Sequence, residues 1–127
     1  MNRMASLERS LGETAEATRL TARVVDSVRE LAARPDASAL HLCLAGQALA
    51  NAEPPQLRYP KLAVSYAEKC AARSGRLNPE SLRIHSLAYR AAGRMEDSRK
   101  VAREGLALMP SGKHRGEVRH GLEELAR

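Results

Sequence analysis

The sequence predicts an all-α protein, built as a stack of antiparallel helical hairpins with an N-terminal helix and a C-terminal capping helix. Apolar residues recur at the three- and four-residue spacing that places them on one face of a helix. No run alternates between apolar and polar residues over the length of a strand. Trp and Phe are absent, and only three Tyr occur among the 127 residues. A core of Leu, Val and Ala suits closely packed helices in one domain.

The N-terminal segment, residues 4–33, is expected to be helical, and Pro35 ends it. The step of five from Ala15 to Leu20 breaks the helical spacing. The segment is therefore either one long, bent helix or a short helix followed by a longer one that Thr14 caps. Two apolar stripes are expected to face inward: Met4, Leu7, Leu11 and Ala15, and then Leu20, Val24, Val28 and Leu31.

The first hairpin is expected to pair helices at residues 38–51 and 60–74, with Asp36 or Ser38 capping the first of them. The connection EPPQLRYP, residues 53–60, holds three prolines, which cannot continue a helix interior. It is therefore predicted to be an extended turn. The facing positions are Leu42, Ala45, Gly46 and Leu49 in one helix, and Ala63, Ala67, Cys70 and Ala71 in the other.

The second hairpin is expected to pair helices at residues 79–92 and 96–109. Asn78 is placed to cap the first helix, and Gly93 provides the turn because glycine adopts positive φ without cost. Glu96 lies in the first turn of the second helix, where a negative charge is favourable. The facing positions are Leu82, His85, Ser86 and Tyr89, and Ser98, Ala102, Gly105 and Leu106.

The two hairpins repeat one pattern. Leu42 precedes Leu82 by 40 residues, and Ala67 precedes Ala102 by 35. All eight pairs of facing positions match with these two offsets, whose difference of five corresponds to an insertion in the turn of the first hairpin. The sequence therefore contains an internal repeat of two helical hairpins.

The order of large, small, turn, small, large and proline in both copies resembles the tetratricopeptide repeat, a helix-turn-helix unit of about 34 residues. The long turn of the first copy resembles a variant common in bacterial multi-repeat proteins. The match departs from the family at His85, where Leu is preferred, and at Ser98 and Gly105, where Ala is preferred. The resemblance implies a right-handed stack, with residues 1–36 as a degenerate repeat and residues 37–127 as two units plus a capping helix.

The capping helix is expected at residues 113–126, with Ser111 as its cap. Val118, Leu122 and Leu125 form its inward stripe, and the remainder is strongly polar. A terminal helix with a polar outer face keeps a stack of repeats soluble.

The sequence offers no catalytic, metal-binding or cofactor-binding constellation. No glycine-rich nucleotide loop occurs. His114 and His120 are six residues apart and His41 and Cys43 are two apart, so neither pair shares a helix face that could hold a metal ion. We therefore expect a protein with no enzymatic activity, cofactor or metal.

The cellular setting predicted from the sequence is the cytoplasm. The N-terminus has no apolar signal region, and no apolar stretch reaches the ~18 residues that suggest a membrane span. Cys43 and Cys70 are accordingly expected to be free thiols. The net charge is +6, and the basic excess is spread along the chain.

In the tetratricopeptide repeat family, the first helix of each unit lines a concave groove that binds a protein or peptide. The resemblance therefore implies an interaction or scaffolding function for this chain. The carboxylate clamp of some family members is absent, because the matching positions include Cys43 and Gln47. Arg83 and Arg90 flank Leu87 and would favour an acidic partner. The implied groove residues are Leu40, Cys43, Gln47, Asn51, Glu80, Arg83, Leu87 and Arg90.

Two other functions stay open at the level of the sequence. The N-terminal segment could support homo-oligomerisation, or a structural role within a larger bacterial protein. The basic charge could favour nucleic acid, since helical repeats also read RNA. Against nucleic acid, stacking aromatic residues are scarce and two units would read very little sequence.

Overall fold

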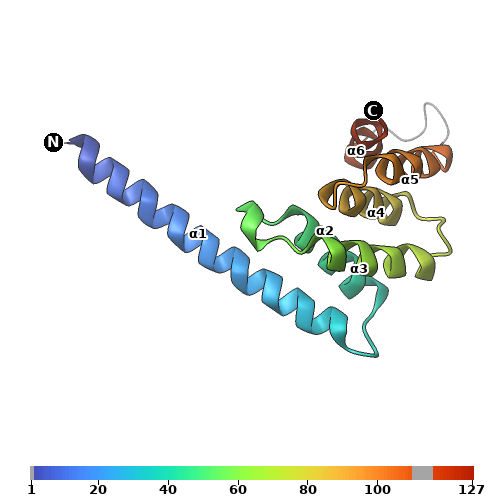
Figure 1. The fold of residues 1–127 in the computed structure, drawn as a ribbon, viewed down its shortest axis with the longest axis horizontal. Coiled ribbons are helices and arrows are strands. Elements are labelled where there is room, and N and C mark those ends of the chain that lie inside the picture. Colours follow the sequence, from blue (N-terminus) through green and yellow to red (C-terminus); the bar gives the residue numbers. More distant parts are fainter. Residues whose placement is uncertain (1, 110–115) are drawn as a thin grey trace.

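The computed structural model describes residues 2–109 and 116–127, with side chains from residue 12 onward, and this part of the chain is entirely helical (Figure 1). No strand occurs in these residues, which confirms the all-α prediction. Among the same residues, no helix combines the length and the apolar character needed to cross a membrane. The elements are α1 (Asn2–Ala33), α2 (Ala39–Asn51), the short 3₁₀ helix η1 (Pro55–Leu57), α3 (Pro60–Arg73), α4 (Pro79–Ala91), α5 (Met95–Ala107) and α6 (Glu117–Ala126).

Helix α1 is continuous, so the first of the two alternatives for the N-terminal segment holds and Thr14 starts no new helix. In the first predicted inward stripe, Met4, Leu7 and Leu11 lie outside the residues whose side chains are described. The second stripe is right at Val28, which packs against a buried cluster, and wrong at Leu20 and Val24. Leu20 and Val24 are 55% and 54% exposed, whereas Val25 is 2% exposed and Ala32 is 6% exposed. The reason is that α1 packs mainly against α2 and touches η1, while its N-terminal half projects away from the other helices (Figure 1). A helix with one neighbour buries only a narrow face.

The predicted boundaries of the two hairpins agree with the structure to within two residues, because the signals at their ends are local. The Ser38 hydroxyl accepts a hydrogen bond from the backbone N–H of His41 at 3.1 Å. The Asn78 side-chain oxygen accepts one from the N–H of Glu80 at 3.0 Å. Gly93 adopts a φ of 79°, as the predicted turn requires. The proline-rich connection interrupts the helix as expected, although it contains the single turn η1.

The helices pack in two rows. Helices α2, α4 and α6 form one row, in which each contacts the next, while α3 and α5 pack against the helices on either side of them. Small residues at the facing positions are buried as predicted: Ala67 and Ala102 are both fully inaccessible. In the second hairpin, the Ser86 hydroxyl donates a 2.6 Å hydrogen bond to the carbonyl oxygen of Ser98. The core therefore continues from α1 to α6 without a break.

Helix α6 covers the end of the second hairpin. Leu122 is fully buried and Leu125 is 8% exposed, and both pack with Ala102 of α5. Val118 is partly buried against the same cluster, so the predicted inward stripe is correct. The helix begins at Glu117, later than predicted, and the predicted cap Ser111 lies outside the described residues.

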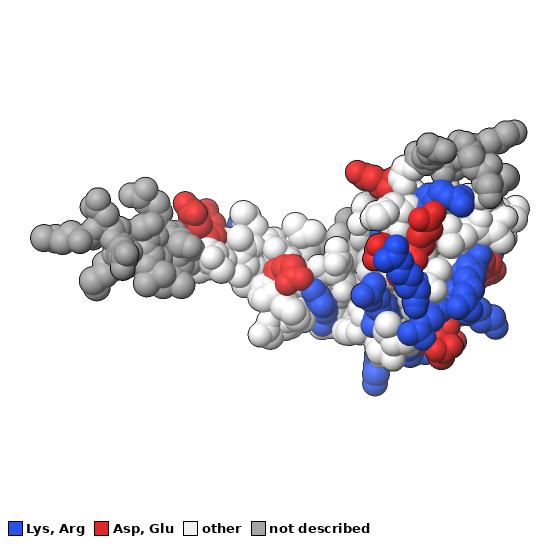
Figure 2. Space-filling view, turned by 90° about the horizontal axis from the view of Figure 1, so that it is seen from above, with Lys and Arg blue, Asp and Glu red and all other residues white. Residues whose placement is uncertain are grey.

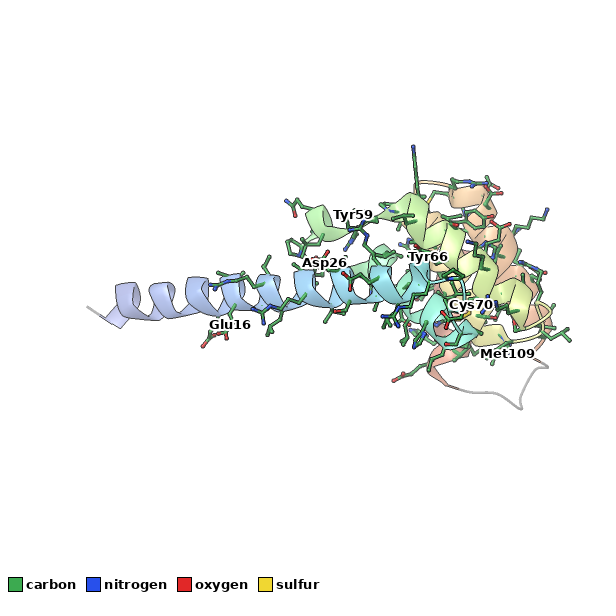
Figure 3. The ribbon with its side chains drawn as sticks, turned by 90° about the horizontal axis from the view of Figure 1, so that it is seen from below. Glu16, Asp26, Tyr59, Tyr66, Cys70 and Met109 are labelled. Atoms are coloured by element: carbon green, nitrogen blue, oxygen red, sulfur yellow. A yellow bond between two sulfur atoms is a disulfide. The ribbon has the colours of Figure 1, made fainter. Side chains whose placement is uncertain are left out.

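The free-thiol prediction for the two cysteines is contradicted, because Cys43 of α2 and Cys70 of α3 form a disulfide. The two helices face each other and bring the Cα atoms of the cysteines to 5.3 Å, within the usual range for a disulfide. Figure 3 shows the bond in yellow beside Cys70. The sequence could not reveal this pairing, because the length and shape of the long turn decide which residues of α2 and α3 face each other.

Candidate interaction groove

Two adjoining hollows lie along α2 and share part of their lining. We call them together the α2 groove. The first hollow, about 390 Å³, lies between α1 and α2, and the second, about 320 Å³, lies between α2 and α4. They share Leu44 and Gln47. The lining also includes Thr21, Val24 and Asn51 in the first, and Leu40, Cys43, Ser74, Glu80, Ser81 and Ile84 in the second.

The groove exposes large aliphatic side chains. Leu40 is 65% exposed, Val24 is 54% exposed and Leu44 is 47% exposed. They come from two helices: Val24 lines the first hollow, Leu40 lines the second, and Leu44 lines both. Contiguous exposed apolar surface of this kind is typical of sites that bind another molecule, whereas single exposed leucines are ordinary.

The groove is close to electrically neutral. Its charged lining residues are Glu53 and Glu80, and no Lys or Arg of the described residues lines either hollow. Glu80 accepts hydrogen bonds from the Arg83 guanidinium at 2.6 and 2.9 Å, and Glu53 pairs with Arg58 at 2.5 Å. Since each carboxylate already has a cationic partner, the surface offers apolar contacts and the amides of Gln47 and Asn51 rather than a net charge.

Five of the eight residues implied by the repeat resemblance line the α2 groove. Leu40, Cys43 and Glu80 border the second hollow, Asn51 borders the first, and Gln47 borders both. Sequence reasoning assigned no binding role to Leu44, Val24 or Cys70. The spacing of four between Leu40 and Leu44 could have indicated a shared helix face, but the approach of α1 and α3 depends on tertiary packing.

The other three residues lie outside these hollows, beside α6. The Arg83 side chain is 20% exposed, and its Cδ would stand 2.9 Å from a Cβ placed on Gly121. Leu87 is partly buried against the cluster that includes Leu122. Arg90 alone is exposed to solvent. The expected basic wall with an open apolar centre is therefore not formed, because α6 packs against that part of α4.

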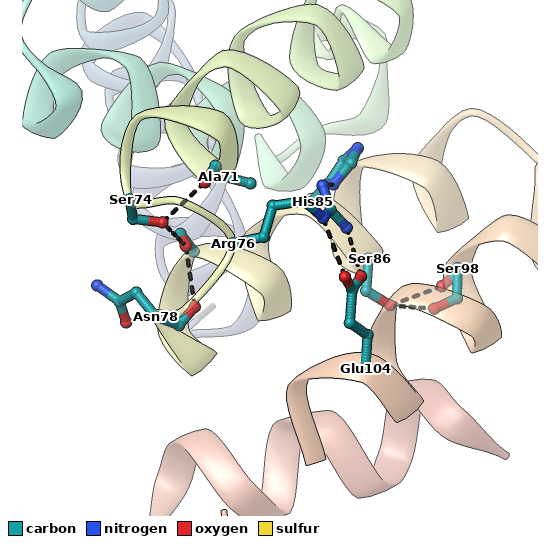
Figure 4. Close-up of polar contacts among 9 residues, drawn as sticks. Ala71, Ser74, Arg76, Asn78, His85, Ser86, Ser98 and Glu104 are labelled. Atoms are coloured by element: carbon teal, nitrogen blue, oxygen red, sulfur yellow. Dashed lines mark hydrogen bonds and ion pairs between the residues drawn. The ribbon is translucent and has the colours of Figure 1, made fainter. Parts of the chain in front are cut away.

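A buried polar cluster joins the second hairpin to the turn that precedes it (Figure 4). His85 is 2% exposed, and its Nδ1 lies 3.5 Å from an Arg76 guanidinium nitrogen. Its Nε2 has no hydrogen-bond partner among the residues that the structure describes. Arg76 in turn pairs with Glu104 of α5 at 2.5 and 3.0 Å. Burial, and then the positive charge of Arg76, lower the pKa of His85. The hydrogen bond from Arg76 lowers the pKa of Glu104.

This cluster holds α3, α4 and α5 together and does not open into the α2 groove. No group of three or more His, Cys, Asp or Glu side chains could hold a metal ion within the described ranges. The cluster therefore has the features of a structural contact, in which the buried, neutral imidazole of His85 lies beside the Arg76–Glu104 ion pair.

Charged side chains of both signs are interleaved on the surface. Figure 2 shows Lys and Arg beside Asp and Glu over the helical stack, with no separate basic field on this face. Several arginines pair with acidic residues of their own helix, such as Arg99 with Glu96 and Arg119 with Glu123.

Comparison with known proteins yields no match to a protein-family model, a curated protein or a solved structure. The functional proposal below therefore rests on the structure itself, and specifically on the exposed apolar lining of the α2 groove.

Proposed function

We propose that the chain is a protein-interaction module of the tetratricopeptide-like type, a right-handed stack of two repeat units whose first helices present a binding groove. Two features support this arrangement. The hairpins α2–α3 and α4–α5 match the internal sequence offsets, and α2, α4 and α6 form one row. An interaction module needs no catalytic group, in keeping with the sequence expectation.

The observation that carries the proposal is the exposure of Val24, Leu40 and Leu44 around two adjoining hollows. Fully burying an exposed large aliphatic side chain contributes about 1.5–3 kcal/mol. These three are about half exposed, so covering each contributes roughly half of that toward the cost of association. The occupant is an apolar segment of a partner protein, bound as an amphipathic helix or an extended peptide. Because the groove is neutral, apolar anchors of the partner contribute more than acidic residues do.

The test is selection of binding peptides from a displayed random library against the intact chain. The selected peptides should carry large apolar residues at regular spacing, and they should bind the groove variant Leu40→Glu with Leu44→Glu at least about ten-fold more weakly. The matched control is Leu77→Glu, since Leu77 is 71% exposed and lies outside both hollows. Equal loss of binding in the control, or unchanged binding in the groove variant, would reject the groove as the binding surface.

Self-association through α1 is a second candidate, favoured by the exposure of Leu20. Leu20 lines neither hollow, so it separates the two functions. If α1 mediates self-association, size-exclusion chromatography with light scattering should show an oligomer for the parent chain and a monomer for Leu20→Glu. Peptide binding in the groove should be the same in both.

A further inference from the structure

The Cys43–Cys70 disulfide is part of the wall of the second hollow, and its two sulfur-bearing residues differ in exposure. Cys70 is 3% exposed and belongs to a buried apolar cluster with Leu42 and Ala45. Cys43 is partly exposed, on the turn of α2 between Leu40 and Gln47. Cys43 is therefore the more exposed of the two residues that the disulfide joins.

Disulfides exchange by attack of a thiolate on one of the two sulfur atoms, so the rate depends on which sulfur can be reached. We propose that Cys43 is a site of reversible modification by a low-molecular-weight thiol such as glutathione. The thiolate attacks the sulfur of Cys43, a new S–S bond forms between Cys43 and the thiol, and the bond to Cys70 breaks. The electron pair stays on the Cys70 sulfur, which takes a proton from solvent, so one thiol is consumed and one is released.

The hairpin does not depend on the disulfide alone. Helices α2 and α3 are also held by the buried residues Leu49, Ala63 and Ala67, and by the close approach of Gly46 to Ala67. The exchanged form should therefore keep its helices. A disulfide with one partly exposed residue exchanges with thiols more readily than a fully buried one, which resists reduction.

The modification would regulate the α2 groove, a consequence that rests on the proposed function. The second hollow measures about 320 Å³ and its wall includes Cys43, Leu40 and Leu44. A tripeptide attached to Cys43 would occupy this space and cover the apolar residues that anchor a partner. The protein would then bind its partner in the disulfide form and release it when the thiol is attached.

The first measurement uses the oxidised wild-type chain in a glutathione buffer. Mixed disulfides are trapped by alkylation and located by peptide mass spectrometry. The expected result is an adduct on Cys43, with Cys70 alkylated as the released thiol. An adduct found mainly on Cys70, no adduct at all, or two free cysteines in protein kept under oxidising conditions would overturn the proposal.

The second measurement compares Cys70→Ser with Cys43→Ser, each shown to be folded by its helical circular dichroism. The single thiol that remains is titrated with a chromogenic aromatic disulfide. The thiol of Cys43 should react faster than that of Cys70 by on the order of ten-fold, because access controls the exchange. Equal rates, or a faster reaction of Cys70, would contradict the assignment. If one variant fails to fold, the wild-type mapping still decides.

The final comparison separates this inference from the proposed function. A selected groove peptide is titrated against wild-type protein and against Cys70→Ser carrying glutathione on Cys43, with Cys70→Ser alone as the control. Loss of binding only in the modified protein supports regulation of the groove. If the adduct forms on Cys43 but binding is unchanged, then the modification site stands and its regulatory role is rejected. If the adduct does not form while groove variants still lose binding, the proposed function stands and the modification site is rejected.

Discussion

Gly46 of α2 lies so close to Ala67 of α3 that a Cβ placed on Gly46 would stand 3.0 Å from the Cβ of Ala67 and 3.2 Å from its Cα. The Ala67 atoms near this Cβ include backbone atoms. Backbone cannot move aside as the end of a flexible side chain can. The corresponding position of the second hairpin holds Ser86, whose hydroxyl bonds to Ser98. The two helices of each hairpin thus meet through small residues, by close contact in the first hairpin and through a hydrogen bond in the second.

Substitution of Gly46 by valine should therefore destabilise the chain. Overpacking of a close helix contact costs about 1–3 kcal/mol, more than the modest gain expected from replacing glycine in a helix. The midpoint of urea unfolding measures the effect. Gly12→Val provides the matched control, since nothing lies within 4 Å of a Cβ on Gly12 in the same kind of element. A Gly46 variant as stable as this control would show that the two helices can move apart freely.

The buried His85 should make stability depend on pH. Because its pKa is lowered in the folded chain, the unfolded chain binds more protons as pH falls below about 6.5, the ordinary histidine value. Stability should therefore be complete above this pH and decline on acidification until the pKa of the folded state is passed. His85→Leu should lose this dependence, since a leucine of comparable shape takes up no proton.

Thermal unfolding of wild type and His85→Leu at about pH 7.5 and about pH 5.5 tests this expectation. The groups that influence His85 include Arg76 and Arg94, which oppose its protonation, and Glu68 and Glu104, which favour it. If the two proteins lose the same stability between these pH values, His85 contributes nothing to the pH dependence, and carboxylates elsewhere account for it.

Arg83 and Arg90 should respond differently to the same change, although both were predicted to face an open groove. Arg83 pairs with Glu80 at 2.6 Å, is influenced by Glu117 and packs its stem against Gly121. Arg83→Glu would remove the packing of the stem and place like charges together, so it should cost on the order of 1 kcal/mol. Arg90→Glu, on exposed surface, should change the free energy of unfolding by less than about 0.5 kcal/mol. Chemical denaturation of the two variants compares them directly, and equal effects would mean that α6 does not cover Arg83 in solution.

Leu122 should be the most sensitive position of α6. It is fully buried among residues of α4, α5 and α6, so Leu122→Ala should destabilise the chain by about 2–5 kcal/mol. Leu77, which is 71% exposed, is the control, and Leu77→Ala should stay within about 0.5 kcal/mol of the parent. Similar melting temperatures for the two variants would show that α6 is not packed on the second hairpin.

Removal of α6 should promote self-association. A chain that ends at Met109 would expose Ala102 and Gly105, which are buried in the intact protein. Terminal repeats need a polar outer face for solubility, so the shortened protein should form oligomers or precipitate. Light scattering at several concentrations measures this, with the intact chain alongside. A monomeric truncated protein that melts like the intact chain would argue against a capping role.

The helices and their boundaries could be predicted from the sequence because their signals are local. Prolines separate α2 from α3, Ser38 and Asn78 cap the helices that follow them, and Gly93 supplies a positive φ. Each of these acts through the backbone of a few neighbouring residues. The small facing residues were also identifiable, since a repeated pattern at fixed offsets specifies which helix faces meet.

The binding surface was only partly predictable, because it depends on what covers each helix. Periodicity placed Leu20 and Val24 on an apolar stripe of α1, but α1 has one main neighbour and buries Val25 instead. Arg83 and Glu80 lie on the same helix. Arg83 is covered by α6, whereas Glu80 lines the second hollow.

The sequence by itself determined the all-α class, the two hairpins and the small residues between their helices, since propensity, capping and periodicity act over a few residues along the chain. The tertiary structure alone decided the Cys43–Cys70 pairing, the covering of Arg83 by α6 and the meeting of two hollows at Leu44. These features depend on the distance and rotation between helices, which the long proline-rich turn and the packing of side chains far apart in the sequence establish together.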